Sequence, residues 1–172
     1  MSSTPVISRR AVLLGTVVLA SLAGCGASKF KTYSGPRVSS VQVFKAKRRM
    51  YLLSEDQKVL RKYRIGLGGN PVGHKQFEGD SKTPEGTYII DRRNPNSAYY
   101  LSLGISYPNS VDRAYAAAQG KKPGGDIFIH GEERKSSGRG RDWTAGCIAV
   151  KNREIEEIYA MVGNGTPIHI FR

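Results

Sequence analysis

The chain has 172 residues, a formal net charge of +13 and two cysteines. This length accommodates one domain with a sizeable core, and two cysteines in unrelated contexts argue against a disulfide framework. We expect neither a metal nor a cofactor, because no cluster of His, Cys or acidic residues has metal-ligand spacing and no glycine motif suits phosphate.

The first 25 residues have the pattern of an export signal. In SRRAVLLGTVVLASLAGC, Arg9 and Arg10 precede an apolar run that is too short for an ordinary membrane span. The run ends in Leu-Ala-Gly-Cys, which resembles a bacterial lipobox and implies cleavage before Cys25 and acylation of its thiol. We predict a signal peptide over residues 1–24 and a lipid anchor on Cys25. An uncleaved anchor is the alternative, and the Sec and twin-arginine export routes both stay open.

The charge that remains after cleavage favours anionic partners. Loss of residues 1–24 removes two arginines and no acid, so the net charge falls from +13 to +11. Such a surface suits nucleic acid, phospholipid head groups or cell-wall polymer. Export, together with the lack of zinc-finger, RNA-recognition and helix-turn-helix patterns, argues against nucleic acid. We predict an exported protein held on a bacterial membrane and facing the periplasm or cell wall.

The mature chain divides into a tether and one domain. Residues 25–38 are rich in Ser, Gly and Lys, as in a flexible tether. Residues 39–172 read mainly as strands, because apolar and polar residues alternate as in half-buried sheet. The expected strand segments lie around Val41 and Val43, over 59–67, over 101–107 and over 167–171. SEDQ at 54–57 predicts a hairpin turn.

Two segments are expected to be helical. VDRAYAAAQ at 111–119 is helix-prone, with Asn109 or Ser110 as its cap and a glycine as its stop. NREIEEIYAMVG at 152–163 carries a stronger signal, since Asn152 can cap it and one side is apolar. The apolar side consists of Ile155, Ile158, Tyr159 and Val162. We expect it to pack on the sheet.

The segment before the second helix carries the candidate chemistry. GDIFIHG at 125–131 is an apolar run that ends in His130, and the loop after it is too polar and glycine-rich for a core. TAGCIAV then places Cys147 in a tight turn after Gly146. A glycine there permits a strained backbone and leaves the amides of the turn free to face a substrate oxygen.

A thiol and an imidazole in this arrangement suit nucleophilic catalysis. A free thiol has a pKa of about 8.5 and becomes an effective nucleophile when an imidazole takes its proton. The alternative is that Cys147 is a small buried hydrophobic residue. The glycine-flanked turn and the lack of a structural partner for Cys147 favour catalysis.

The pattern of these residues resembles a known family of cell-wall enzymes. His130-Gly131, a variable loop, and Thr144-x-Gly146-Cys147, with His130 and Cys147 separated by 17 positions, resemble the YkuD-type L,D-transpeptidases. The resemblance extends through GLGGNPVGHKQFEGDSKTPEGTYII and NPNSAYYLSLGISYPN and so covers residues 39–172.

The resemblance implies a fold and a set of roles. The fold is α+β, mainly β with a few helices: a β-sandwich in which a helix follows the cysteine turn. Cys147 matches the nucleophile, His130 its base, and Gly131 the residue whose carbonyl orients the imidazole. Gly146 and Thr144 belong to the turn, in which the amides of Gly146 and Cys147 match the oxyanion hole.

The implied reaction is acyl transfer through a cysteine. The thiol attacks the carbonyl between a diaminopimelate-type L-centre and a terminal D-residue of a peptidoglycan stem peptide. An amine of another stem, a lysine of a peptidoglycan-linked lipoprotein, or water then resolves the acyl-enzyme. An L,D-transpeptidase, a carboxypeptidase or amidase that hydrolyses such links, and a non-catalytic peptidoglycan-binding lipoprotein therefore remain as alternatives.

Two positions depart from the family pattern. The usual His before Gly-Cys is Ala145, and the arginine common two residues after the nucleophile is Ala149. A guanidinium at position 149 would suit a carboxylate. Its loss implies that the substrate is bound differently.

Four further residues are candidates for substrate binding: His74, Arg139, Arg141 and Trp143. In the family, the region around His74 lies near the cleft, and Trp143 would form a wall beside the nucleophile. The two arginines would meet anionic polymer. The alternatives are a solvated loop for the three polar side chains and a packing anchor for the tryptophan.

Overall fold

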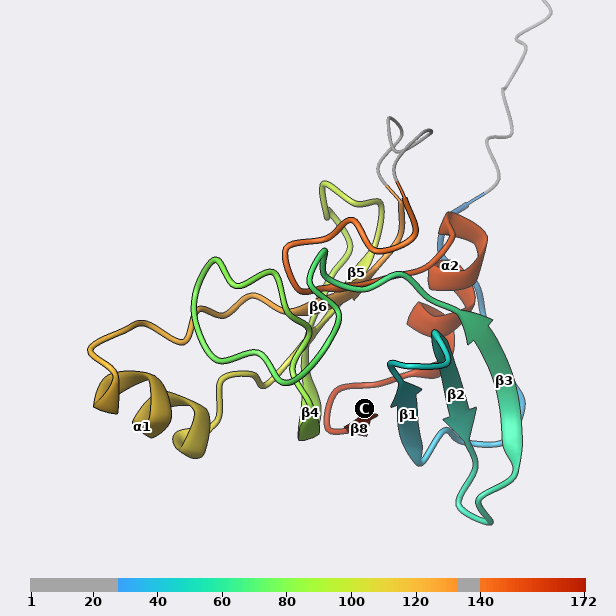
Figure 1. Cartoon of the computed structure of the whole chain (residues 1–172). Helices are drawn as coiled ribbons and strands as arrows, with labels where there is room; N and C mark the ends of the chain where they lie inside the picture. The colour runs from blue at the N-terminus through green and yellow to red at the C-terminus, as the bar shows by residue number, and fades with distance from the viewer. Residues whose placement is uncertain (1–27, 133–139) are drawn as a thin grey trace, which may run out of the picture.

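The computed structural model describes residues 28–132 and 140–172. These residues form eight strands and two helices (Figure 1). Their order along the chain is β1 (Ser40–Phe44), β2 (Arg49–Leu53), β3 (Val59–Arg64), β4 (Gly86–Asn94), β5 (Ser102–Ile105), α1 (Ser110–Ala118), β6 (Phe128–His130), β7 (Ile148–Ala149), α2 (Asn152–Met161) and β8 (Pro167–Phe171). The expected hairpin turn at 54–57 joins β2 and β3, which pair antiparallel.

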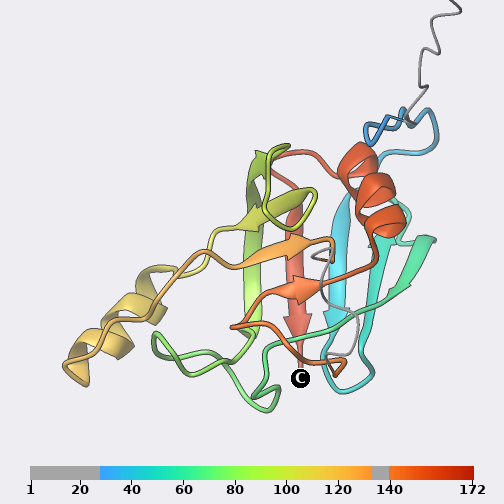
Figure 2. The ribbon, with the colours of Figure 1, turned by 90° about the horizontal axis from the view of Figure 1, so that it is seen from above.

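One curled sheet contains these strands, in the order β3-β2-β1-β8-β4-β5-β6-β7. The sheet bends at β4, whose first half pairs with β8 and whose second half pairs with β5, with a register shift between Ile90 and Arg92. As a result, β5, β6 and β7 run across the strands behind them (Figure 2). The prediction of a mainly β domain with few helices is confirmed, and the two layers of the expected sandwich are the two halves of one sheet.

The two ends of the curled sheet meet at β7. Gly66, just after β3, exchanges backbone hydrogen bonds of 2.8 and 2.9 Å with Ala149, and Gly68 forms a bridge with Thr144. A Cβ on Gly66 would lie 2.2 Å from the carbonyl oxygen of Arg141, so only glycine permits this approach. The closure brings residues 66–69 beside the cysteine turn.

The second helix packs its apolar side into the hydrophobic core of the domain. Its predicted apolar side is confirmed: Ile155, Ile158 and Val162 are fully buried and Tyr159 is 9% exposed. Each such side chain contributes about 1.5–3 kcal/mol through burial. Both views place α1 at the opposite end of the molecule from α2 (Figures 1 and 2).

The helix caps differ from each other in how well the sequence predicts them. Asn109 caps α1, since its Oδ1 accepts from the amides of Val111 and Asp112 at 2.9 and 3.0 Å. The prediction that Asn152 caps α2 is wrong. Lys151 is the last extended residue and therefore the N-cap, while Asn152 is already helical. The side chain of Asn152 instead accepts from the amide of Glu132 at 2.9 Å.

Part of the expected tether lies on the domain. Lys31 forms an ion pair of 3.0 Å with Glu156, and the rings of Phe30 and Tyr159 are 6.3 Å apart. Val38 is 4% exposed.

Within the described residues, no helix is long and apolar enough to cross a membrane.

Candidate active site

Strand pairing places the imidazole of His130 and the thiol of Cys147 on the same side of the sheet. β6 and β7 are parallel, with Ile129 opposite Ile148 and His130 opposite Ala149. Side chains alternate between the faces of a strand. His130, Ala149 and the preceding Cys147 therefore share one face, while Ile129 and Ile148 point into the core.

The imidazole of His130 is buried and held in one orientation. The side chain is 3% exposed, and its Nδ1 lies 2.5 Å from the carbonyl oxygen of Gly131. A carbonyl only accepts, so Nδ1 carries the proton and Nε2 of the neutral ring is left as an acceptor. Burial lowers the pKa of His130, although the Gly131 carbonyl opposes this shift. The ring is therefore a neutral base near pH 7.

Two aromatic rings enclose the imidazole. The ring centroid of Tyr99 lies 4.4 Å from that of His130, and Trp143 approaches it edge-on at 5.7 Å. Tyr99 and Trp143 are 5.8 Å apart. Trp143 thus lies directly against the imidazole of His130. Tyr99 is not among the predicted residues, although Tyr99 and Tyr100 form an aromatic pair directly before the 101–107 segment.

The thiol of Cys147 is free and partly exposed. The amide of Phe128 donates to its Sγ at 3.4 Å, and Sγ lies 3.5 Å from the carbonyl oxygen of Asp126, to which the S–H donates. Burial raises the pKa of Cys147, and the Phe128 amide opposes this shift only in part. The resting thiol is therefore protonated and needs a base to become a nucleophile.

A threonine hydroxyl closes the cysteine turn. Oγ1 of Thr144 accepts from the amide of Gly146 at 3.1 Å and donates to the carbonyl of Cys147 at 2.8 Å. Gly146 has φ +138°, and a Cβ there would lie 2.7 Å from the carbonyl oxygen of Lys82. Of the two amides expected in the oxyanion hole, that of Gly146 is therefore already bonded within the turn. The amide of Cys147 has no acceptor among the described residues.

An internal ion pair supports the loop behind this turn. Lys75 is 3% exposed, and its Nζ donates to Oδ1 of Asp80 at 2.8 Å. The Asp80 carboxylate also accepts from three amides of the same loop, those of Gln76, Phe77 and Lys82. Burial alone would raise the pKa of Asp80, but Lys75 and these amides lower it. The pair fixes the segment whose Lys82 carbonyl contacts Gly146.

His74 belongs to a separate network. Its Nδ1 accepts from the amide of Glu85 at 2.9 Å, and its Nε2 lies 3.0 Å from Oδ1 of Asp112 in α1. Asp112 also accepts from the hydroxyl of Tyr88 at 3.0 Å. These contacts connect the 71–85 loop with α1 and β4. None of them involves His130 or Cys147.

Two predicted residues, Cys25 and Arg139, lie outside the described residues. Across residues 28–132 and 140–172, no group of three or more His, Cys, Asp or Glu side chains could hold a metal ion.

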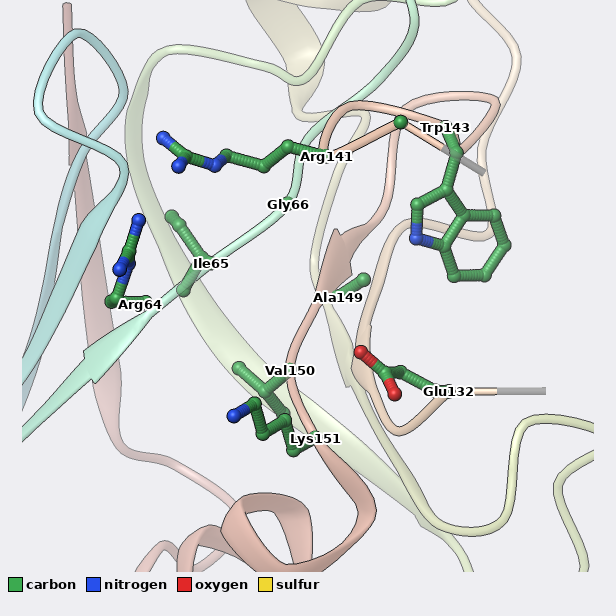
Figure 3. A pocket seen from close by; sticks show the side chains of 10 residues that line it. Arg64, Ile65, Gly66, Glu132, Arg141, Trp143, Ala149, Val150 and Lys151 are labelled. Carbon is green, nitrogen blue, oxygen red and sulfur yellow. The ribbon is translucent and has the colours of Figure 1, made fainter. Parts of the chain in front are cut away.

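A cavity of about 260 Å³ lies beside the pair (Figure 3). It is lined by Arg64, Ile65, Gly66, Glu132, Gly140, Arg141, Trp143, Ala149, Val150 and Lys151. Neither Cys147 nor His130 lines it. Trp143 and Ala149 connect the cavity with His130: both residues line the cavity, Trp143 contacts the imidazole, and Ala149 lies opposite His130 in the sheet.

The sequence of the domain matches a family model. The model for the L,D-transpeptidase catalytic domain, YkuD, matches residues 39–170. The chain therefore belongs to the L,D-transpeptidase catalytic domain family.

Known relatives agree with this assignment. Escherichia coli YafK, whose name places it among the L,D-transpeptidases, is 34% identical over 127 residues, which are 71% of this chain and 46% of YafK. The helical cell shape determining protein Pgp2 of Campylobacter jejuni superposes with a TM-score of 0.60 and 31% identity, over 80% of this chain and 49% of Pgp2. Bdellovibrio bacteriovorus Bd1075 superposes with a TM-score of 0.56 and 25% identity, over 79% of this chain and 48% of Bd1075. The chain thus spans about half the length of these relatives.

Proposed function

We propose that this protein is a cysteine acyltransferase that acts on peptidoglycan stem peptides, as an L,D-transpeptidase. The observation that carries the proposal is the position of His130 at the end of β6 and of Cys147 directly before β7, on the same side of the sheet. Nδ1 of His130 is also bonded to the Gly131 carbonyl. This bond leaves Nε2 as the atom that accepts a proton. A nucleophile, a base and a group that orients the base are the parts that such a reaction needs.

In the first half of the proposed reaction, Nε2 of His130 takes the thiol proton. Sγ of Cys147 attacks the carbonyl between the L-centre of a diaminopimelate-type residue and the terminal D-residue. The amide of Cys147 donates to the oxyanion that forms. The C–N bond then breaks, and His130 returns the proton to the leaving amine. The product is a thioester.

In the second half, an acceptor amine attacks the thioester while His130 takes one of its protons. The C–S bond breaks, and the proton passes from His130 to the sulfur. Free enzyme and a new amide bond result. With water in place of the amine, the same steps give a hydrolase.

Muropeptide mass spectrometry tests the proposal. The full chain is incubated with a tetrapeptide muropeptide, with and without an excess of a second stem that carries a free amine. We expect a product that has lost the terminal D-residue and gained the acceptor. A product that has lost the terminal D-residue and carries a free carboxylate in its place, without the acceptor, would identify a hydrolase. Unchanged substrate under both conditions would contradict the proposed function.

We also propose that the protein is exported and held on a membrane by a lipid on Cys25. The Leu-Ala-Gly-Cys sequence after a short apolar run supports this proposal. Replacing Cys25 by Ala is expected to abolish acylation and release the protein from the membrane fraction. Intact-mass measurement of the native membrane-bound protein is the check, and an unmodified Cys25 in that fraction would exclude the anchor.

A further inference from the structure

The cavity beside Trp143 has an apolar floor and a charged rim. Its floor is made by the bridge between Gly66 and Ala149 together with the buried side chains of Ile65 and Val150. Its rim carries three cationic residues, Arg64, Arg141 and Lys151, and one acidic residue, Glu132. The lining therefore has an excess of positive charge, which favours an anionic ligand.

These cationic side chains are available to a ligand. Arg64, Arg141 and Lys151 are exposed, and none of their side chains forms an ion pair or hydrogen bond with another residue in the described part of the chain. Figure 3 shows the guanidinium groups of Arg64 and Arg141 on one side of the cavity, with Trp143 and Glu132 on the other. Guanidinium groups suit a carboxylate, because each presents several donors in a fixed plane.

The backbone that carries Arg141 is held firmly. The next residue, Asp142, accepts from Nη2 of Arg48 at 2.7 Å and from Nε of Arg48 at 3.0 Å. Its Oδ1 also accepts from the amide of Leu67 at 3.0 Å. The carbonyl of Arg141 lies against Gly66, where no larger residue fits. Arg141 is thus presented to the cavity from a fixed position.

The size of residue 149 connects the cavity with the catalytic pair. Ala149 lines the cavity, lies opposite His130 and is two residues from Cys147. A long side chain at this position would occupy the cavity, whereas alanine leaves it open. A group bound there would lie near Ala149 and Trp143, the two lining residues that pair with or contact His130.

We infer that this cavity is a carboxylate-binding subsite, in which Arg141 and Arg64 hold a carboxylate of the stem peptide whose peptide bond Cys147 attacks. The inference rests on the proposed function for the identity of the peptide. Lys151 adds positive charge at the rim, and the volume of about 260 Å³ fits one amino-acid end of the peptide. The carboxylate clamp thus comes from two segments outside the turn and not from residue 149.

Steady-state kinetics of the full chain with a donor tetrapeptide tests this subsite. Arg141→Gln together with Arg64→Gln is expected to raise KM by about tenfold or more, because hydrogen bonds to charged groups are lost, with a smaller change in kcat. Lys62→Gln is the matched control. Lys62 is exposed on β3, two residues from Arg64 on the same strand face, and does not line the cavity. We expect its KM to stay close to that of the unaltered chain.

A peptide amidated at its carboxylates is the second arm. It should bind the unaltered chain about as weakly as the double variant binds the free acid, and the double variant should discriminate little between the two peptides. Equal KM values for the double variant and Lys62→Gln would overturn the inference. If the unaltered chain turns over neither peptide, the proposed function fails. Calorimetric binding of both peptides to the Cys147→Ser chain then still tests the subsite, which is refuted if the acid and the amide bind alike.

Discussion

Replacing Cys147 by Ser is expected to lower the turnover of stem peptides by about 10⁴-fold or more, as when other activated nucleophiles are removed. A serine hydroxyl holds its proton far more tightly than a thiol, and the neutral His130 cannot remove it as readily. The fold should be unaffected, because the change in volume is small and the turn is closed by Thr144 and by the backbone of residue 147. Turnover is measured by mass spectrometry of the muropeptides, and stability by thermal unfolding.

The combination of the two measurements separates a catalytic from a structural cysteine. A Cys147→Ser chain that melts like the unaltered protein and is inactive agrees with a nucleophile. A chain that melts at a clearly lower temperature and still processes stem peptides at the normal rate would mean that the thiol is structural.

Replacing His130 by Gln is expected to lower kcat by about 10²–10⁴-fold, the usual contribution of a positioned proton-transfer group. The thiol should also react more slowly with iodoacetamide near pH 7, because it loses the base that removes its proton. The matched control is His169→Gln. His169 lies on β8 and contacts Thr87 at 3.0 Å, away from the β6–β7 face, so this change should leave both rates nearly unaltered.

The pH dependence of the unaltered chain follows from the same two groups. The pKa of His130 is lowered, so the base stays neutral until the pH falls below the usual range of histidine and is then lost by protonation. The pKa of Cys147 is raised, so the thiol stays protonated above pH 7. Activity should therefore persist into mildly acidic solution. An alkylation rate for His130→Gln equal to that of the unaltered chain across this range would show that His130 does not act on Cys147.

The same shift predicts how His130 affects stability. A histidine that is buried in its neutral form binds its proton less readily in the folded chain than in the unfolded chain. The contribution of the neutral ring to the free energy of unfolding is complete above the pKa of an unfolded histidine, about 6.5. It is lost as the pH falls toward the lowered pKa of His130 in the folded chain. His130→Gln should thus weaken the loss of stability below pH 6.5.

Parts of the fold with a strong local pattern are well predicted from the sequence. The apolar side of α2 and the turn at 54–57 depend on neighbouring residues only, and the structure contains both. Alternation over 101–107 correctly predicts a strand but not its burial. All four residues of β5 are buried, since β5 lies between β4 and β6 in the curled sheet.

Features that depend on distant contacts were missed. The strand β4 was not predicted. Tyr88 and Ile90 alternate with exposed residues, but the charged residues Asp91, Arg92 and Arg93 then interrupt the alternation. The closure of the sheet at Gly66 requires knowledge of where Arg141 lies, which no local pattern reveals.

The candidate site shows the same division. His130 and Cys147 could be named as candidates because each lies at a recognisable local feature, the end of an apolar strand and a glycine turn. Tyr99 and the pair of Arg48 and Asp142 were not found, because their partners are far away in the sequence. Arg64 reads from the sequence as an ordinary exposed strand residue, and only the fold brings it to the cavity.

Covalent capture tests the central claim most directly. The full chain is incubated with a donor tetrapeptide or a carbapenem, quenched in acid, digested and analysed by mass spectrometry to locate the adduct. We predict an acyl group on the sulfur of Cys147, absent from Cys147→Ser and formed more slowly in His130→Gln. An acyl adduct on a residue other than Cys147 would contradict the account. So would turnover by the unaltered chain without any adduct, combined with full activity of the Cys147→Ser chain.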